Sequence, residues 1–114
     1  MELISKYTRS AFSDQLVVDW TMRTIGDLFD GADIPRVSQD DGQPPIGSVR
    51  RALISDYYRG VDWSSPSDVR KVLSVYEQVL AQIATDSVAY QKLTNLLKRD
   101  GFVYRDRLIT SMTG

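Results

Sequence analysis

The stretch from Trp63 to Ile83 constrains the fold more than any other part of the chain. Ser65 can accept a hydrogen bond from a free backbone N–H, Pro66 suits a first helical position, and Asp68 stands where a reciprocal capping carboxylate belongs. A helix therefore begins there. Its apolar positions recur every three or four residues, at Val69, Val72, Leu73, Tyr76, Val79, Leu80 and Ile83. This spacing predicts the central core helix.

Four further helices are predicted from the same period and from their capping residues. They run from Ser5 or Thr8 to about Trp20, from Thr21 to Asp30, from a Ser48 cap to Gly60, and from about Asp86 to Arg99. Gly31 is expected to form a left-handed cap after the second helix, because glycine has no Cβ. The third helix is expected to present inward Val49, Ala52, Leu53 and Tyr57.

The remaining segments predict a loop and a hairpin. Residues 32–46 contain three prolines and the polar cluster Ser38-Gln39-Asp40-Asp41, which favours a surface loop. After Gly101 the period becomes two, with Phe102, Tyr104 and, beyond an Arg105-Asp106 turn, Leu108. We therefore expect residues 1–114 to be a single, mainly α domain of about five helices with a small carboxy-terminal β-hairpin.

Two missing residue types exclude several kinds of chemistry. The 114 residues include no cysteine and no histidine, which excludes disulfides, thiolate metal sites and histidine-dependent catalysis. No nucleophile elbow, dinucleotide fingerprint or phosphate loop is found in the sequence. We therefore expect no enzyme, no cofactor and no small-molecule substrate.

Charge and hydropathy limit the partners and the location. Fourteen basic and fifteen acidic side chains leave a net charge of −1, so nucleic-acid binding would need a local patch. No run of about 20 apolar residues could span a membrane, and the first residues do not form the apolar region of a signal peptide. These features predict a cytoplasmic protein with no membrane partner.

Five aspartates raise the alternative of a metal-dependent enzyme. They lie around the end of the second helix and in the loop, at Asp27, Asp30, Asp33, Asp40 and Asp41. Carboxylate oxygens suit Mg²⁺ or Ca²⁺, but the spacing is not that of a calcium loop. We favour solvated helix ends and predict no metal site.

Two basic sets are candidates for contact with a partner or a nucleic acid. The first set is Arg50, Arg51 and Arg59, and the second combines basic and aromatic side chains at Lys98, Arg99, Tyr104, Arg105 and Arg107. Trp63 is a further candidate, because tryptophan is enriched at binding hot spots. Its position beside the capping sequence instead favours a packing role, in which Trp63 covers the start of the central helix.

The segment from Arg50 to Ile109 resembles the amino-terminal module of bacterial abortive-infection proteins. The resemblance rests on Val61-Asp62-Trp63, on the runs 68–80 (DVRKVLSVYEQVL) and 96–104 (LLKRDGFVY), and on the opening 3–9 (LISKYTR). In these anti-phage defence families a small helical domain precedes an effector, often a helical RNase with an arginine–histidine motif. Without histidine this chain cannot supply that motif.

The resemblance thus implies a recognition or assembly module. It would act on an attached effector, as part of a longer protein, or on a separate one. We expect a non-catalytic role in protein interaction or self-association. A nucleic-acid-binding module using the carboxy-terminal basic and aromatic set is the alternative.

Overall fold

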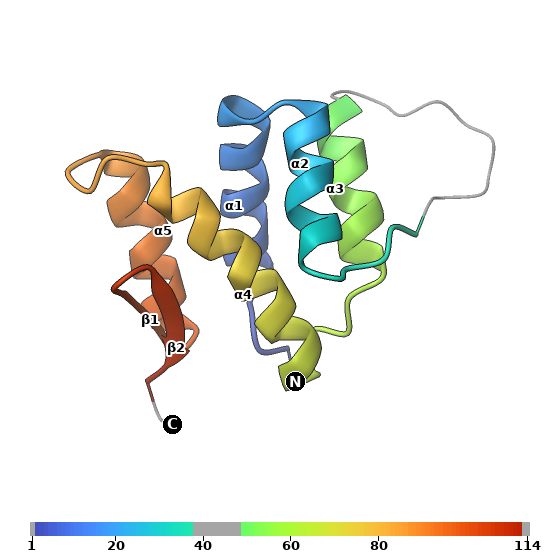
Figure 1. The fold of residues 1–114 in the computed structure, drawn as a ribbon. Helices are drawn as coiled ribbons and strands as arrows, with labels where there is room; N and C mark the ends of the chain where they lie inside the picture. Colours follow the sequence, from blue (N-terminus) through green and yellow to red (C-terminus); the bar gives the residue numbers. More distant parts are fainter. Residues whose placement is uncertain (1, 38–48, 113–114) are drawn as a thin grey trace.

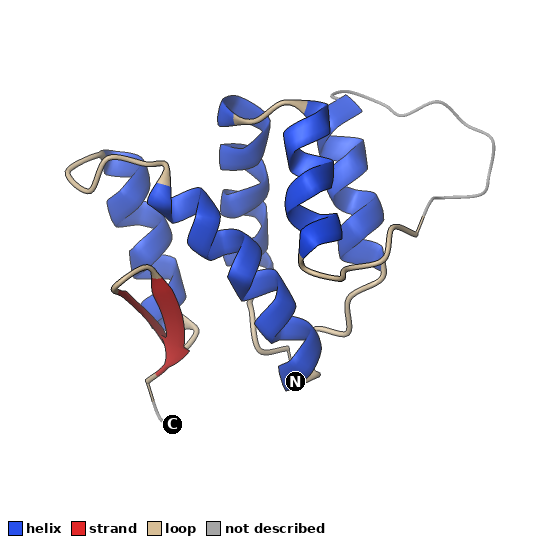
Figure 2. Cartoon of the chain, viewed as in Figure 1, coloured by secondary structure: helices blue, strands red, loops and turns tan. Residues whose placement is uncertain are grey.

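The computed structural model describes residues 2–37 and 49–112, which form five helices followed by one antiparallel hairpin (Figures 1 and 2). The prediction of a mainly α fold with a small carboxy-terminal hairpin is confirmed. The elements are α1 (Lys6–Asp19), α2 (Met22–Gly31), α3 (Val49–Arg59), α4 (Pro66–Ala81), α5 (Val88–Arg99), β1 (Phe102–Arg105) and β2 (Leu108–Ser111). In this described part no helix is long and apolar enough to cross a membrane.

The helix α4 lies between the layer formed by α1, α2 and α3 and the carboxy-terminal hairpin. Helices α1, α2 and α3 stand side by side, and α4 runs at an angle to them and packs against α1 and α2 (Figure 1). Helix α5 packs on α1, while the hairpin lies with β1 against α5 and β2 against α4. The predicted central helix therefore contacts both the three-helix layer and the hairpin.

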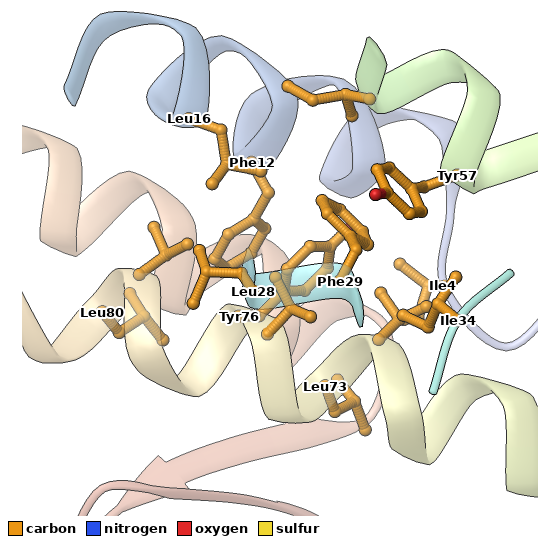
Figure 3. Packing of buried hydrophobic residues seen from close by; sticks show 14 of the residues in the cluster. Ile4, Phe12, Leu16, Leu28, Phe29, Ile34, Tyr57, Leu73, Tyr76 and Leu80 are labelled. Carbon is orange, nitrogen blue, oxygen red and sulfur yellow. The ribbon is translucent and has the colours of Figure 1, made fainter. Parts of the chain in front are cut away.

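The buried face of α4 meets aromatic side chains from the three-helix layer (Figure 3). The Phe12 and Tyr76 rings stack with centroids 3.8 Å apart, and the Phe29 and Tyr57 rings stack at 4.7 Å. Every apolar position within α4 that was predicted to face the core is buried, and Val75 joins them with no exposed surface. Ile83, predicted to belong to the same helix, lies beyond its end at Ala81 and is partly buried. The core therefore lies between α4 and the three-helix layer.

Hydroxyl side chains start the helices for which a cap is described. Ser5, Thr21, Ser65 and Ser87 each accept a hydrogen bond from the backbone N–H three residues later. The prediction for Asp68 was wrong in its partner, because its carboxylate accepts from the N–H of Asp62 at 2.9 Å and not from Ser65. The carboxylate thereby ties the preceding turn to α4. The predicted Ser48 cap and residues 38–46 of the predicted loop lie outside the described residues.

Two expectations about helix faces and ends need correction. Gly31 belongs to α2, and the left-handed residue that follows is Asp33, with φ of 61°. Aspartate tolerates this conformation better than most residues with a Cβ. Val49 is 57% exposed at the start of α3, whereas Ile54 is fully buried. Leu53 and Tyr57 are buried as predicted, and Ile54 takes the place of Val49 on the inward face of α3.

The hairpin turns one residue later than predicted. Asp106 and Arg107 form the two-residue connection with φ of 54° and 64°, as a type I′ turn requires. This turn pairs Tyr104 with Ile109, so Ile109 shares the inner face and is fully buried. Leu108, the apolar residue that was expected to follow the turn, is 54% exposed. A shift of one residue exchanges the two faces of a strand.

A pair of charged α4 side chains holds the outer edge of β2. The Glu77 carboxylate accepts from the Ile109 N–H at 2.7 Å, and Arg70 donates to the Ile109 carbonyl oxygen at 2.6 Å. Arg70 and Glu77 also form an ion pair with each other. Both backbone groups of Ile109 are thus satisfied at an edge that would otherwise lack partners.

The end of α5 caps the start of α1. One carboxylate oxygen of Asp100 accepts from the Ser5 N–H at 2.9 Å, the Ser5 hydroxyl at 3.2 Å and the Thr8 hydroxyl at 2.7 Å. A negative charge at a helix amino terminus also interacts favourably with the helix dipole. Asp100 therefore connects two helices that are distant in the sequence.

Candidate functional site

The three arginines of α3 have separate partners. Arg50 donates to the carbonyl oxygen of Trp20 at 3.2 Å, and Arg51 pairs with the Asp14 carboxylate at 2.5 Å. Arg59 donates to Asp56 at 2.9 Å and to the carbonyl oxygen of Val37 at 2.6 Å. The set predicted from sequence is therefore divided among three parts of the structure.

Trp63 packs against the core and contacts Tyr58 and Arg9. Its ring meets the Tyr58 ring edge to face, with centroids 5.2 Å apart. The Arg9 guanidinium lies over the same ring, 4.5 Å from the centroid. Trp63 thus supports the base of a neighbouring surface formed by α1 and α3.

The carboxy-terminal basic and aromatic set is spread along α5 and the hairpin. Lys98 and Arg99 are exposed in the last turn of α5, while Arg105 and Arg107 are exposed at the tip of the hairpin. Tyr104 packs edge to face on Tyr90, with ring centroids 6.2 Å apart. Tyr90 precedes Arg99 by nine residues, or roughly 13 Å at about 1.5 Å per helical residue. The two pairs of cations therefore lie at different levels along α5.

The aspartates do not form a metal site where they are described. Asp30 accepts a hydrogen bond from the Tyr57 hydroxyl at 2.9 Å, and Asp33 occupies the left-handed turn. Within residues 2–37 and 49–112, no three Asp or Glu side chains gather as metal ligands would. Asp40 and Asp41 lie outside the described residues.

A polar groove that was not anticipated from the sequence runs between α1 and α3. We call it the α1–α3 groove; it is open to solvent and has a volume of about 400 Å³. Its lining combines cations and hydroxyls, from Glu2, Lys6, Arg9, Ser10, Ser13, Arg51, Ser55 and Tyr58. Three of the charged side chains are cationic and one is anionic. The groove therefore favours an anionic group.

Helical geometry explains why these side chains share a surface. Residues 6, 9, 10 and 13 of α1 follow the helical spacing i, i+3, i+4 and i+7, and residues 51, 55 and 58 of α3 follow i, i+4 and i+7. Such spacing aligns them along one side of each helix. The polar stripes could have been found in the sequence. The contact between α1 and α3 could not, because it depends on the tertiary fold.

Arg9 is the most deeply placed cation of the groove. Its side chain is 13% exposed and pairs with the Glu2 carboxylate at 3.0 Å. Its Nε–H is buried without an acceptor among the described residues. An unpaired buried donor costs about 1–3 kcal/mol of stability.

The hydroxyl groups of the groove differ in availability. Ser10, Ser13 and Ser55 form no hydrogen bonds with other described residues through their side chains. The Tyr58 hydroxyl instead lies 3.2 Å from the Arg9 carbonyl oxygen and 2.6 Å from the Tyr76 hydroxyl. Burial raises the pKa of Tyr58 well above its usual value, so the phenol stays protonated. The groove can therefore offer serine donors, but Tyr58 cannot act as a base near neutral pH.

A second cavity of about 510 Å³ lies among α4, the hairpin and the end of α5, and it is more apolar. Leu73, Phe102 and Ile109 line it, together with Arg70 and Asp100. Arg70 is already bound to the backbone of Ile109, and Asp100 caps α1. Its polar groups thus serve the fold.

Comparison with protein-family models, with curated proteins and with solved structures finds no match to this chain.

Proposed function

We propose that this protein is a non-catalytic module that binds a protein partner through the α1–α3 groove. The observation that carries the proposal is the groove itself, where cations and serine hydroxyls line an open surface. The chain has no histidine or cysteine to serve as base or nucleophile. Binding is therefore the activity that these side chains support best.

The biological setting rests on the sequence resemblance. On that ground we place the module in a cytoplasmic anti-phage system of the abortive-infection type, acting on an attached or associated effector. The module would bind one state of the effector more tightly than the other, and this difference in affinity would shift the effector between its two states. Loss of protection against phage plating in a Ser55→Glu strain would support this setting, with a Gln91→Glu strain as control. Equal protection in both strains would oppose it.

Photocrosslinking in cells tests the groove as the binding surface. A photoreactive residue replaces Ser55, which is exposed in the groove, or Gln91, which is exposed on α5. We expect position 55 to crosslink to a defined protein and position 91 not to do so. Crosslinks to the same proteins from both positions, or none from position 55, would contradict the proposal. Substrate turnover by the purified chain alone would contradict its non-catalytic part.

A nucleic-acid-binding role is the second candidate, because Lys98, Arg99, Arg105 and Arg107 are all exposed. Phosphate contacts make affinity fall steeply as salt rises. Binding of RNA or DNA at low salt that is abolished by Arg105→Gln with Arg107→Gln would support this role. Absence of binding at low salt would remove it.

A further inference from the structure

Building on the proposed function, we infer that the α1–α3 groove binds an acidic segment of the partner protein. Carboxylate side chains of that segment would be bound by Arg9, Arg51 and Lys6. The groove volume of about 400 Å³ falls in the range of about 300–1,000 Å³ that is typical of ligand sites. It is large enough for a few side chains of an extended peptide.

Carboxylates of the protein itself already show the chemistry of these cations. Glu2 pairs with Arg9 at 3.0 Å, and Asp14 pairs with Arg51 at 2.5 Å. Asp14 and Arg51 are each about half exposed. Exposed ion pairs contribute little to stability, so a carboxylate of the partner can replace the Asp14 carboxylate beside Arg51 at low cost.

Hydrogen-bond donors complete the site for a carboxylate. The guanidinium groups can bind two carboxylate oxygens at once, which gives a directional contact. Ser10 and Ser55 are exposed, Ser13 lies deeper, and none is hydrogen-bonded through its side chain to other described residues. Their hydroxyls can therefore donate to a second carboxylate or to a peptide carbonyl.

The distribution of charge favours a peptide over a nucleic acid. Glu2 lies in the groove and Asp14 lies beside Arg51, so carboxylates interrupt the positive charge. A continuous phosphate backbone would meet these like charges, whereas carboxylates spaced along a peptide can avoid them. The protein as a whole also carries a net charge of −1, which gives no long-range attraction for a nucleic acid.

The test uses the full chain and an alternating Glu-Ser octapeptide, with a Gln-Ser octapeptide as the uncharged probe. Binding is followed by backbone amide chemical shifts. We expect the Glu-Ser peptide to shift the amides of Ser10, Ser13 and Ser55, and the Gln-Ser peptide to shift none of them. Affinity should fall as salt rises, because exposed charges are screened.

Matched variants test whether the charge of the groove decides binding. Ser55→Glu adds a carboxylate to an exposed groove position, and Gln91→Glu adds one to an exposed position on α5. Ser55→Glu should weaken binding of the Glu-Ser peptide by about tenfold or more, while Gln91→Glu should change it by less than about twofold. Circular dichroism of both variants checks that each is folded.

Three outcomes would overturn the inference. These are no binding of the Glu-Ser peptide, equal weakening by the two variants, or tighter binding of a single-stranded oligonucleotide at the same amides. The proposed function is tested separately, and it would fail if position 55 formed no protein crosslinks or formed the same ones as position 91. A protein crosslinked at position 55 in cells, together with no binding of the Glu-Ser peptide, would preserve the partner-binding surface and reject only its acidic ligand.

Discussion

Arg9 shows how one residue connects the candidate site to the core. Its guanidinium covers the Trp63 ring and pairs with Glu2, while its backbone oxygen lies 3.2 Å from the Tyr58 hydroxyl. The sequence pointed to Arg50, Arg51 and Arg59 because they form a local set. Nothing local distinguishes Arg9, since Trp63 and Tyr58 come from distant parts of the chain.

A substitution of Leu73 tests the packing of α4 at the residue scale. Leu73 is 3% exposed, and its removal leaves a space that the backbone cannot fill completely. Because the side chain borders the cavity beside the hairpin, we expect Leu73→Ala to lower the free energy of unfolding by about 2–3 kcal/mol, near the low end of such substitutions. Urea unfolding measures the loss. Val88→Ala at an 82% exposed position should cost less than about 1 kcal/mol.

The elements differ in how far the sequence determines them. The start and inner face of α4 follow from Ser65, Pro66 and a regular apolar period, and the structure agrees. The hairpin was predicted, but its register was not. Asp106 and Arg107 adopt left-handed conformations, and the contacts of Ile109 with Arg70 and Glu77 hold the strand in place. Those contacts join residues more than thirty positions apart.

Removal of the Glu77 carboxylate should loosen the hairpin without unfolding the helices. Glu77→Ala takes the acceptor from the Ile109 N–H and leaves Arg70 without its ion-pair partner. We expect amide hydrogen exchange at Ile109 to accelerate by at least about tenfold, while α4 amides keep their protection. In Glu77→Gln, which can still accept a hydrogen bond, the exchange rate at Ile109 should lie between the rates in the parent protein and in Glu77→Ala. Unchanged exchange at Ile109 in Glu77→Ala would show that the side chain does not hold the strand.

Loss of the Asp100 cap should destabilise the contact between α1 and α5. Asp100→Ala removes three hydrogen bonds to Ser5 and Thr8, of which Thr8 is fully buried. Hydrogen bonds to charged groups contribute about 1.5–3 kcal/mol, and we expect a loss of about 2 kcal/mol in the free energy of unfolding. Thermal unfolding by circular dichroism measures it. Asp86→Ala, at an exposed position before α5, is the control and should have little effect.

At the scale of the whole molecule, the sequence predicts the helices and strands better than it predicts which of them pack against one another. Amphipathic periods identify which face of a helix is buried, but not which helix covers it. The contact of α1 with α3 creates the α1–α3 groove, and the contact of α1 with α5 depends on Asp100. The polar stripes of the groove were visible in the sequence, yet only the fold brings them together.

The fully buried Tyr76 and the partly buried Tyr58 make the stability of the whole fold sensitive to alkaline pH. Burial raises the pKa values of Tyr58 and Tyr76 well above the ordinary value near 10. The folded state thus holds these protons more tightly than the unfolded state. Their contribution is fully present below about pH 10 and is lost as pH rises from there towards the folded-state pKa values.

We therefore expect the free energy of unfolding to fall above about pH 10, by up to about 1.4 kcal/mol per pH unit for each buried phenol. Urea unfolding at a series of pH values measures this slope, and phenolate absorbance reports the ionisation on unfolding. A Tyr58→Phe, Tyr76→Phe double variant should show a shallower slope. Tyr7→Phe, at a 78% exposed position, should keep that of the parent protein. Equal slopes in the double variant and the parent would show that the hydroxyl pair joining Tyr58 and Tyr76 at 2.6 Å does not couple folding to alkaline pH.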